Sequence, residues 1–384
     1  MMRRIFAAAA LTIALVALCA SGSAAGKGPQ PGHGKGNGKG KGHGQTSMSV
    51  FASGFNNPRG LKFGPDGNLY VAEGGLGGSD STVGQCDQVP PPVGPYTGST
   101  NDPVMGGRIS MVTPAGVVST VVDSLPSSQT QPLPAPLVSG VADVAFLHGQ
   151  LYGLLAGAGC SHGVATVPNG VFSVGAGNTW SMVADLSAFV HANPVANPNP
   201  GDFEPDETWY SMIAAKGSLY VVGPNHGEVD RVWTNGTIRR VVDVSAHYGH
   251  NVPTAITRHG VFYLGNLGLF DPADQAGDEH AYQLNPNGRI RVRARGLEKV
   301  LGLAFRGGKL YALEMSTSAG GPVPGTGTIV RVRAGHPAET IVSGLVFPTG
   351  MTIGRDGAFY VSEQGFGFPA GEGRIIRITT GHHH

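Results

Sequence analysis

The sequence predicts an all-β fold, a six-bladed β-propeller with four antiparallel strands in each blade. A strand with a central tyrosine recurs six times, at Tyr70, Tyr152, Tyr220, Tyr263, Tyr311 and Tyr360. The last four tyrosines lie roughly 40 to 50 residues apart, which is the length of a four-stranded blade. Each tyrosine strand follows another apolar strand, most clearly in PRGLKFGPDGNLYVAEGG at 58–75. The wider spacing of the first two tyrosines indicates inserted loops.

Third and fourth strands complete the blades, as in GRISMVT and VVSTVVD of the first blade. Gly and Asn in the connecting segments suit turns with positive φ. The sixth blade has a third strand, GRIIRI, but no fourth strand before the chain ends. Because SVFASGF at 49–55 precedes PRGL just as TIVSGLVF precedes PTGM, we expect the N-terminal strand to complete this blade. Closure of this kind removes an exposed sheet edge.

The segments outside the propeller have distinct compositions. Residues 1–25 begin with Arg3 and Arg4 before an apolar run, the pattern of a secretory signal peptide that is short for a membrane anchor, so we expect a secreted or periplasmic protein. Residues 26–47 form a Gly/Lys-rich linker. Its basic part at 26–45 is expected either to contact an anionic cell wall or to serve as a solubilising spacer. The propeller is expected at 48–380, and 381–384 resemble a purification tag.

Composition and missing motifs narrow the function. Charged residues make up 13% of the chain and the net charge is +1, which argues against a nucleic-acid partner. The chain has no GxSxG, HExxH, GxxxxGK[ST] or CxxC motif. Hydrolases of the nucleophile-elbow type, zincins, P-loop proteins and thioredoxins therefore lack their usual signatures.

Two cysteines remain once the leader is removed. Cys86 lies in the loop after the second strand of blade one, and Cys160 lies in the corresponding loop of blade two. Equivalent loops of neighbouring blades share a face, and an even number of cysteines in an exported protein favours a disulfide. The alternative is a metal-binding thiolate pair, for which the usual ligand spacing is absent.

A ring of oxygen-bearing side chains is predicted at one rim. The third residue after each tyrosine is Glu73, Leu155, Gly223, Asn266, Glu314 and Glu363. The three glutamates are candidate ligands for Ca²⁺ or another divalent cation, because such hard ions prefer carboxylate and amide oxygens. In the alternative interpretation these groups cap neighbouring loops by accepting backbone N–H bonds.

Residues that face the axis are candidates for ligand binding. The channel-facing positions are mostly small, and Asp143 is the only charged residue among them. Arg59 and Tyr210 precede two such positions. Arg59 is expected either to pair with Asp143 or to meet a bound anion.

Loops at the same rim supply further candidates. Asn225 and His226 follow the second strand of blade three, while His250 and Asn251 precede blade four. The two histidines could meet across the rim as a general base or as metal ligands, although a rim histidine is often only a hydrogen-bonding residue. Together with Asn266, the two asparagines are candidate ligand-binding residues. The insert at 193–210 is too long for a plain connection and is expected to form a lid or an acidic rim.

Several of these segments resemble the ScyD/ScyE family of secreted propellers. The resemblance is carried by FNNPRGLKFGPDGNLYVAEGG, AGAGCSH, NPVANPNPGDFEPDETWYSM, PNHGEVDRV and FPTGMTIGRDGAFYVSEQGFG. It implies an exported propeller and no established activity. More distantly, the strand pattern is similar to NHL repeats, streptogramin lyase and SMP-30-type lactonases, whose rims hold metal ligands and a catalytic His or carboxylate.

Three functional hypotheses follow. The first is an exported propeller that binds a polar ligand at its rim, with or without Ca²⁺. The second is a metal-dependent lyase or lactonase that uses Glu73, Glu314 and Glu363 as ligands and His226 or His250 as base. The third is a cell-wall-associated scaffold tethered by residues 26–45.

Overall fold

The computed structural model of the protein describes residues 46–88, 97–99, 106–130, 137–269, 277–319 and 321–381. The predicted signal peptide, the linker up to residue 45 and His382 to His384 lie outside these ranges. Within the described residues, no helix has the length and apolar character needed to cross a membrane.

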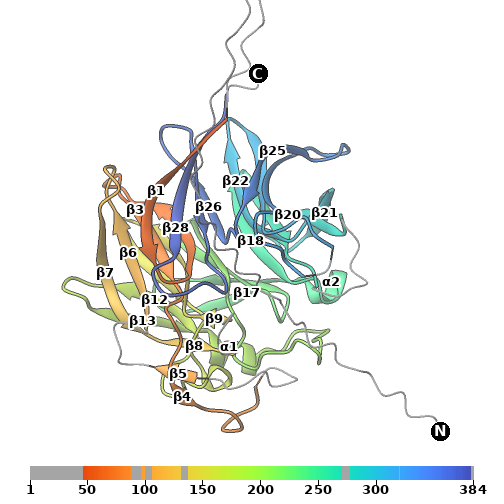
Figure 1. The fold of residues 1–384 in the computed structure, drawn as a ribbon. Coiled ribbons are helices and arrows are strands. Elements are labelled where there is room, and N and C mark those ends of the chain that lie inside the picture. Colours follow the sequence, from red (N-terminus) through yellow and green to blue (C-terminus); the bar gives the residue numbers. More distant parts are fainter. Residues whose placement is uncertain are drawn as a thin grey trace, which may run out of the picture.

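Six four-stranded antiparallel sheets confirm the predicted blades (Figure 1). Blade 1 contains β2 (Pro58–Phe63), β3 (Leu69–Glu73), β6 (Gly107–Val112) and β7 (Val118–Leu125). Blade 2 contains β10 (Val141–Leu147), β11 (Gln150–Leu155), β12 (Gly170–Val174) and β13 (Trp180–Asp185). Blade 3 contains β14 (Ser211–Ala215), β15 (Ser218–Gly223), β16 (Glu228–Val232) and β17 (Ile238–Asp243).

The remaining blades follow the same order along the chain. Blade 4 contains β18 (Pro253–His259), β19 (Val261–Asn266), β20 (Glu279–Leu284) and β21 (Ile290–Leu297). Blade 5 contains β22 (Val300–Arg306), β23 (Lys309–Glu314), β24 (Gly327–Val332) and β25 (Glu339–Leu345). Blade 6 contains β26 (Gly350–Ile353), β27 (Phe359–Glu363), β28 (Gly373–Thr379) and the N-terminal β1 (Ser47–Phe55).

The predicted closure of the ring is confirmed. Strand β1 pairs antiparallel with β28, with Ser47 opposite Thr379 and Phe55 opposite Gly373, so that the two ends of the chain share one sheet (Figure 1). The innermost strands β2, β10, β14, β18, β22 and β26 each contact the next one around the ring. The six sheets therefore stand around one axis.

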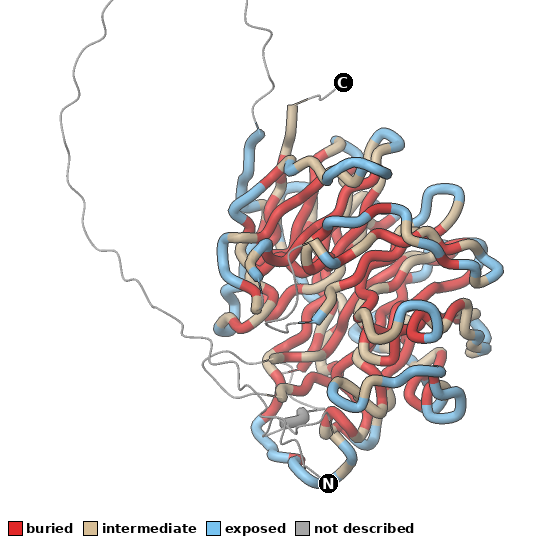
Figure 2. Tube along the Cα trace, turned by 90° about the vertical axis from the view of Figure 1, so that its right-hand side faces the viewer, coloured by how far each residue is buried: buried red, intermediate tan, exposed pale blue. Residues whose placement is uncertain are grey.

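The core consists of apolar layers between neighbouring blades. One such cluster joins blades 2 and 3 through Leu154, Trp209 and Met212, and five others fill the remaining gaps between blades. Figure 2 shows buried segments inside the molecule and exposed segments around them. Near the axis the side chains must be small: a Cβ on Gly60 would overlap the Asp143 carboxylate.

The inserted loops form structure that the repeat pattern does not contain. A small sheet joins β4 (Asp80–Ser81), β5 (Thr97–Ser99), β8 (Ser127–Gln129) and β9 (Val138–Ser139). Short helices occur at η1 (Cys160–His162), α1 (Leu186–Ala192) and α2 (Ser245–Tyr248). Cys86 and Cys160 form the predicted disulfide, with Cα atoms 5.8 Å apart, so the thiolate-pair alternative does not apply.

Candidate functional site

An axial cavity of about 470 Å³ opens at the rim where strands enter and leave the blades. Its lining includes one residue next to or within the innermost strand of each blade: Arg59, Ser139, Tyr210, Thr254, Leu301 and Thr349. Loops that leave the second strands contribute Asn225, Gly268, Met315 and Phe366. The rigid frame of six blades thus places side chains from distant parts of the sequence around one space.

Arg59 and Tyr210 line the axial cavity and make hydrogen bonds between blades. The Tyr210 hydroxyl donates to the Thr349 carbonyl at 2.8 Å, on the opposite side of the ring. Arg59 donates to the carbonyls of Val138, at 2.7 Å, and Gly365. Burial raises the pKa of Tyr210 and keeps its hydroxyl protonated. Both predicted ligand-binding residues therefore line the cavity, but these hydrogen bonds join blades to one another.

One wall of the axial cavity is acidic and comes from the insert at 193–210. Asp202 and Glu204 both line the cavity. Asp202 contacts the Nε2 of His250 at 2.8 Å, and Glu204 contacts the Nε2 of His162 at 3.0 Å. Each carboxylate is thus in contact with an imidazole nitrogen. The expected acidic rim is found, although the lining also includes the apolar residues Leu267, Leu301, Met315 and Phe366.

His162 is a site residue that the sequence analysis did not single out. Its Nδ1 lies 3.1 Å from the Ser128 hydroxyl, and its side chain is almost fully buried. Burial disfavours the charged imidazole, but the nearby carboxylates, chiefly Glu204, raise the pKa of His162 above its usual value. Its position two residues after Cys160 was the available signal, because the disulfide anchors that turn.

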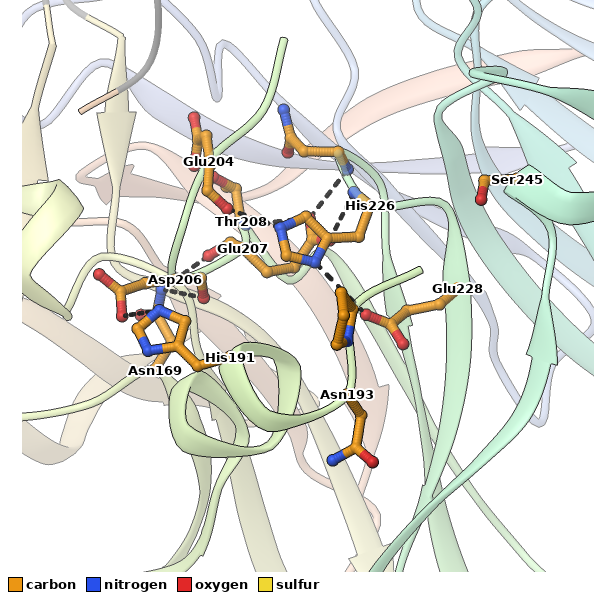
Figure 3. A network of polar contacts seen from close by, with 12 residues as sticks. Asn169, His191, Asn193, Glu204, Asp206, Glu207, Thr208, His226, Glu228 and Ser245 are labelled. Atoms are coloured by element: carbon orange, nitrogen blue, oxygen red, sulfur yellow. Dashed lines mark hydrogen bonds and ion pairs between the residues drawn. The ribbon is translucent and has the colours of Figure 1, made fainter. Parts of the chain in front are cut away.

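A buried polar network lies where the insert meets blade 3 (Figure 3). The His226 ring stacks on Phe203 with centroids 4.6 Å apart, and its Nε2 lies 2.8 Å from the Glu204 carbonyl. Its Nδ1 faces Glu207 at 3.8 Å and Glu228 at 3.6 Å. Figure 3 shows the imidazole between these two carboxylates. His226 is 2% exposed, and neither it nor His250 lines the axial cavity; the two histidines contact different residues of the insert, Glu204 and Asp202.

Burial and like charge perturb the protonation of this network. Burial raises the pKa of Glu207 to about 7, against the opposing effect of His226. The carboxylates of Glu207 and Glu228 overcome burial and raise the pKa of His226 to about 9. Asp230 also has its pKa raised, by burial and by Glu228. The network therefore holds more negative charge than a protein interior readily accepts.

The three rim glutamates act as caps for neighbouring loops. Glu73 accepts the Asn56 N–H at 2.6 Å, Glu314 accepts the Glu298 N–H at 3.0 Å, and Glu363 accepts the Val346 N–H at 2.9 Å. Among the described residues, they do not form a group that could share one ion; the group whose ligand atoms all lie within 4.8 Å is Glu207, His226 and Glu228. These contacts fit the capping interpretation, and the residues do not fit a shared calcium site.

Three other predicted ligand residues lie away from the cavity lining. Asp143 pairs with Lys62 at 3.2 Å and accepts the Met212 N–H at 2.8 Å, so the expected pair with Arg59 is wrong. Lys62 can reach the buried carboxylate from the same strand as Gly60. The Asn251 amide donates to the Tyr282 hydroxyl at 3.0 Å, and Asn266 accepts the His280 N–H at 2.7 Å. Their polar groups thus hold blade 4 together.

Comparison with known proteins identifies similar folds among solved structures. No family profile and no curated protein matches the chain. The structure of a putative oxidoreductase (glucose dehydrogenase) from Thermus thermophilus aligns with 87% of this chain and 100% of its own, at TM-score 0.54 and 16% identity. A Xanthomonas campestris gluconolactonase aligns with 87% of this chain and 90% of its own, at TM-score 0.51 and 9% identity.

A third similar structure is a PQQ-bound aldose sugar dehydrogenase from Streptomyces coelicolor, which aligns with 87% of this chain and 98% of its own, at TM-score 0.50 and 11% identity. At such identities the likeness concerns the fold alone. The expected ScyD/ScyE membership stays a prediction. The chain has the six-bladed β-propeller fold that these lactonase and sugar dehydrogenase structures share.

Proposed function

We propose that the protein binds a small amphiphilic molecule in the axial cavity. The observation that carries this proposal is that the cavity lining combines apolar side chains with the carboxylates of Asp202 and Glu204. The volume of about 470 Å³ falls within the usual range for small-molecule sites. The sequence suggested a polar ligand; the lining favours a ligand that also has an apolar body.

The chemistry of the two walls defines the ligand class. Leu267, Met315 and Phe366 offer apolar surface to an aliphatic or aromatic ring system. The carboxyl oxygens of Asp202 and Glu204 accept hydrogen bonds, so they favour ligand groups that donate, such as hydroxyl or ammonium, over groups that can only accept, such as a sulfonate. A ring system with one donor-bearing edge satisfies both walls.

A matched pair of fluorescent probes tests this function. N-phenyl-1-naphthylamine is apolar with one N–H donor, and 1-anilinonaphthalene-8-sulfonate adds a sulfonate to the same skeleton. We expect the neutral probe to bind about tenfold more tightly, a difference of about 1.4 kcal/mol, because the sulfonate meets the acidic wall. Binding is measured by fluorescence titration.

Two variants locate the binding site of the neutral probe. Leu267→Trp should weaken its binding by filling the axial cavity, whereas Val117→Trp, at a side chain 62% exposed in blade 1, should leave it unchanged. Equal binding of both probes by the wild-type protein contradicts the acidic-wall argument. Unchanged binding in Leu267→Trp contradicts the cavity itself.

A lyase or lactonase is the second candidate function. The observation that favours it is the contact of each cavity carboxylate with a histidine, since such pairs can hold a general base in place. We expect Glu204→Gln to lower kcat for lactone opening by about 100-fold, the usual contribution of a general base. Glu339→Gln, a variant in blade 5, is the control. A panel of lactones with no turnover by the wild-type protein contradicts this candidate.

We also infer that the protein works outside the cytoplasm. The Cys86–Cys160 disulfide supports an oxidising compartment. The leader at 1–25 and the basic segment at 26–45 remain predictions, and so does cell-wall contact through the latter. Retention on isolated cell walls that survives neutralising the lysines of 26–45 would contradict that contact.

A further inference from the structure

The group formed by Glu207, His226 and Glu228 is distinct from the axial cavity and from the predicted carboxylate ring. Its ligand atoms lie within 4.8 Å of one another, and all three residues are buried. Two of the facing atoms, His226 Nδ1 and Glu228 Oε1, have no hydrogen-bond partner among the described residues. Buried polar atoms are rarely left without partners, so these atoms call for an explanation.

The tautomer of His226 directs a lone pair into this group. Its Nε2 lies 2.8 Å from the Glu204 carbonyl, which accepts but cannot donate, so Nε2 carries the hydrogen. In the neutral ring, Nδ1 then presents its lone pair to Glu207 and Glu228. Metal-binding histidines are commonly oriented in this way, by donating the other ring N–H to a carbonyl.

The charge balance also calls for a cation. Glu207, Glu228 and Asp230 are fully or almost fully buried, and both oxygens of Asp230 lack a hydrogen-bond partner. Arg240 is the arginine in contact with this set, through a short hydrogen bond from its Nε to Glu228. When a metal and not a proton occupies the Nδ1 side of His226, the ring is neutral, and three ionised carboxylates with one guanidinium leave an excess of two negative charges. A divalent cation balances them.

We propose that Glu207, His226 and Glu228 bind one divalent transition-metal ion, such as Zn²⁺ or Mn²⁺. Imidazole nitrogen and carboxylate oxygen together suit these ions, whereas Ca²⁺ prefers an all-oxygen set. The ion joins the insert at 193–210 to strand β16. It therefore positions the chain that carries Asp202 and Glu204 on the acidic wall of the cavity.

Cobalt binding tests this site directly, because Co²⁺ takes the same ligands and absorbs visible light. The full chain is used with His382, His383 and His384 replaced by alanine, so that the terminal histidines do not bind metal. We expect one equivalent of Co²⁺ to bind with a d–d absorption band, to be displaced by Zn²⁺, and to resist displacement by Ca²⁺. The same protein should melt at a lower temperature after chelation than with Zn²⁺.

Matched variants separate this site from its alternatives. His226→Gln and Glu228→Gln should weaken Co²⁺ binding by at least about 100-fold. His250→Gln and Glu314→Gln remove the same groups outside the cluster and should retain the band. Circular dichroism checks that each variant is folded.

The wild-type measurements do not depend on the variants folding. No stoichiometric Co²⁺ binding, together with a melting temperature that chelation leaves unchanged, shows that a proton on His226 and not a metal balances the carboxylates. Loss of the band in Glu314→Gln, or its retention in His226→Gln, also overturns the proposal. Probe binding in the axial cavity is scored separately, so the two proposals fail independently.

Discussion

Blades 1 and 6 differ from blade 3 at one cross-strand pair on the rim. In blade 1 Glu73 lies opposite Arg108 and contacts it at 2.8 Å, and in blade 6 Glu363 lies opposite Arg374 and contacts it at 2.9 Å. At the same register in blade 3, Gly223 lies opposite Glu228. The glutamate is replaced by glycine and the arginine by glutamate.

The exchange makes room for a residue from another segment. A Cβ on Gly223 would lie 2.8 Å from the Glu207 Oε2, so the missing side chain creates the space that Glu207 occupies. Glu207 then accepts the N–H groups of Asn225 and His226, at 2.8 and 2.7 Å, and adopts a positive φ of 58°. A non-glycine residue in that region is strained, and such strain often marks functional sites. Glu207 therefore still caps the loop, but its carboxylate lies next to the carboxylate of Glu228 where blades 1 and 6 have an arginine.

The largest expected effect comes from removing the arginine in blade 1. Arg108→Met leaves the fully buried Glu73 without its cation, although the Asn56 N–H and the Ser110 hydroxyl remain bonded to it. Breaking a buried ion pair from one side should lower the free energy of unfolding by about 3 kcal/mol. Denaturant unfolding measures the change.

The matched control for this variant is Arg333→Met, because Arg333 reaches Glu339 only at 4.0 Å on an exposed surface. Exposed pairs of this kind contribute about 0 to 1 kcal/mol. Similar losses in the two variants would contradict the difference between buried and exposed pairs.

The sequence could predict the rim glutamates because they follow the tyrosine repeat. Counting three residues from Tyr70, Tyr311 and Tyr360 finds Glu73, Glu314 and Glu363 without any structure. Their partners Asn56, Glu298 and Val346 lie in loops of varied sequence, so the choice between capping and metal binding needed coordinates. The spacing alone does not say which groups the carboxylates meet.

The cluster in blade 3 could not be found by the repeat. Glu207 lies in the insert at 193–210, and Glu228 stands where blades 1, 5 and 6 have arginine or threonine. Their meeting depends on how 193–210 folds back over β16. A glycine at the position that is glutamate in three other blades was the available signal.

Blade 5 is intermediate between the Glu–Arg pairs of blades 1 and 6 and the Gly–Glu pair of blade 3. Its glutamate should make stability depend on pH. Glu314 lies opposite Thr328, whose neutral hydroxyl bonds to it, and burial raises the pKa of Glu314 from 4.5 to about 7. Between these values the folded protein binds more protons than the unfolded chain, so stability falls as pH rises. At 1.36 kcal/mol per pKa unit, the loss is of the order of 3 kcal/mol by pH 8.

Glu314→Gln should remove this part of the pH dependence. Melting temperatures at pH 5 and pH 8, measured in chelator, should differ less in this variant than in the wild-type protein. Glu339→Gln, at a partly exposed side chain of the same blade, should keep the wild-type slope. Identical slopes in all three proteins would show that Glu314 does not contribute.

The smallest expected effect has the opposite sign and returns to blade 3. Asp230 lies two residues after Glu228 on the same face of β16, fully buried and without a hydrogen-bond partner for either oxygen among the described residues. Because a neutral amide loses less hydration on burial than a carboxylate, Asp230→Asn should stabilise the chelated protein at pH 8 by about 1 kcal/mol. Saturating Zn²⁺ should abolish the gain, since the variant removes a negative charge that the cation offsets. If Asp230→Asn still stabilises the protein in Zn²⁺, or destabilises it in chelator, the buried carboxylates of blade 3 do not depend on a cation.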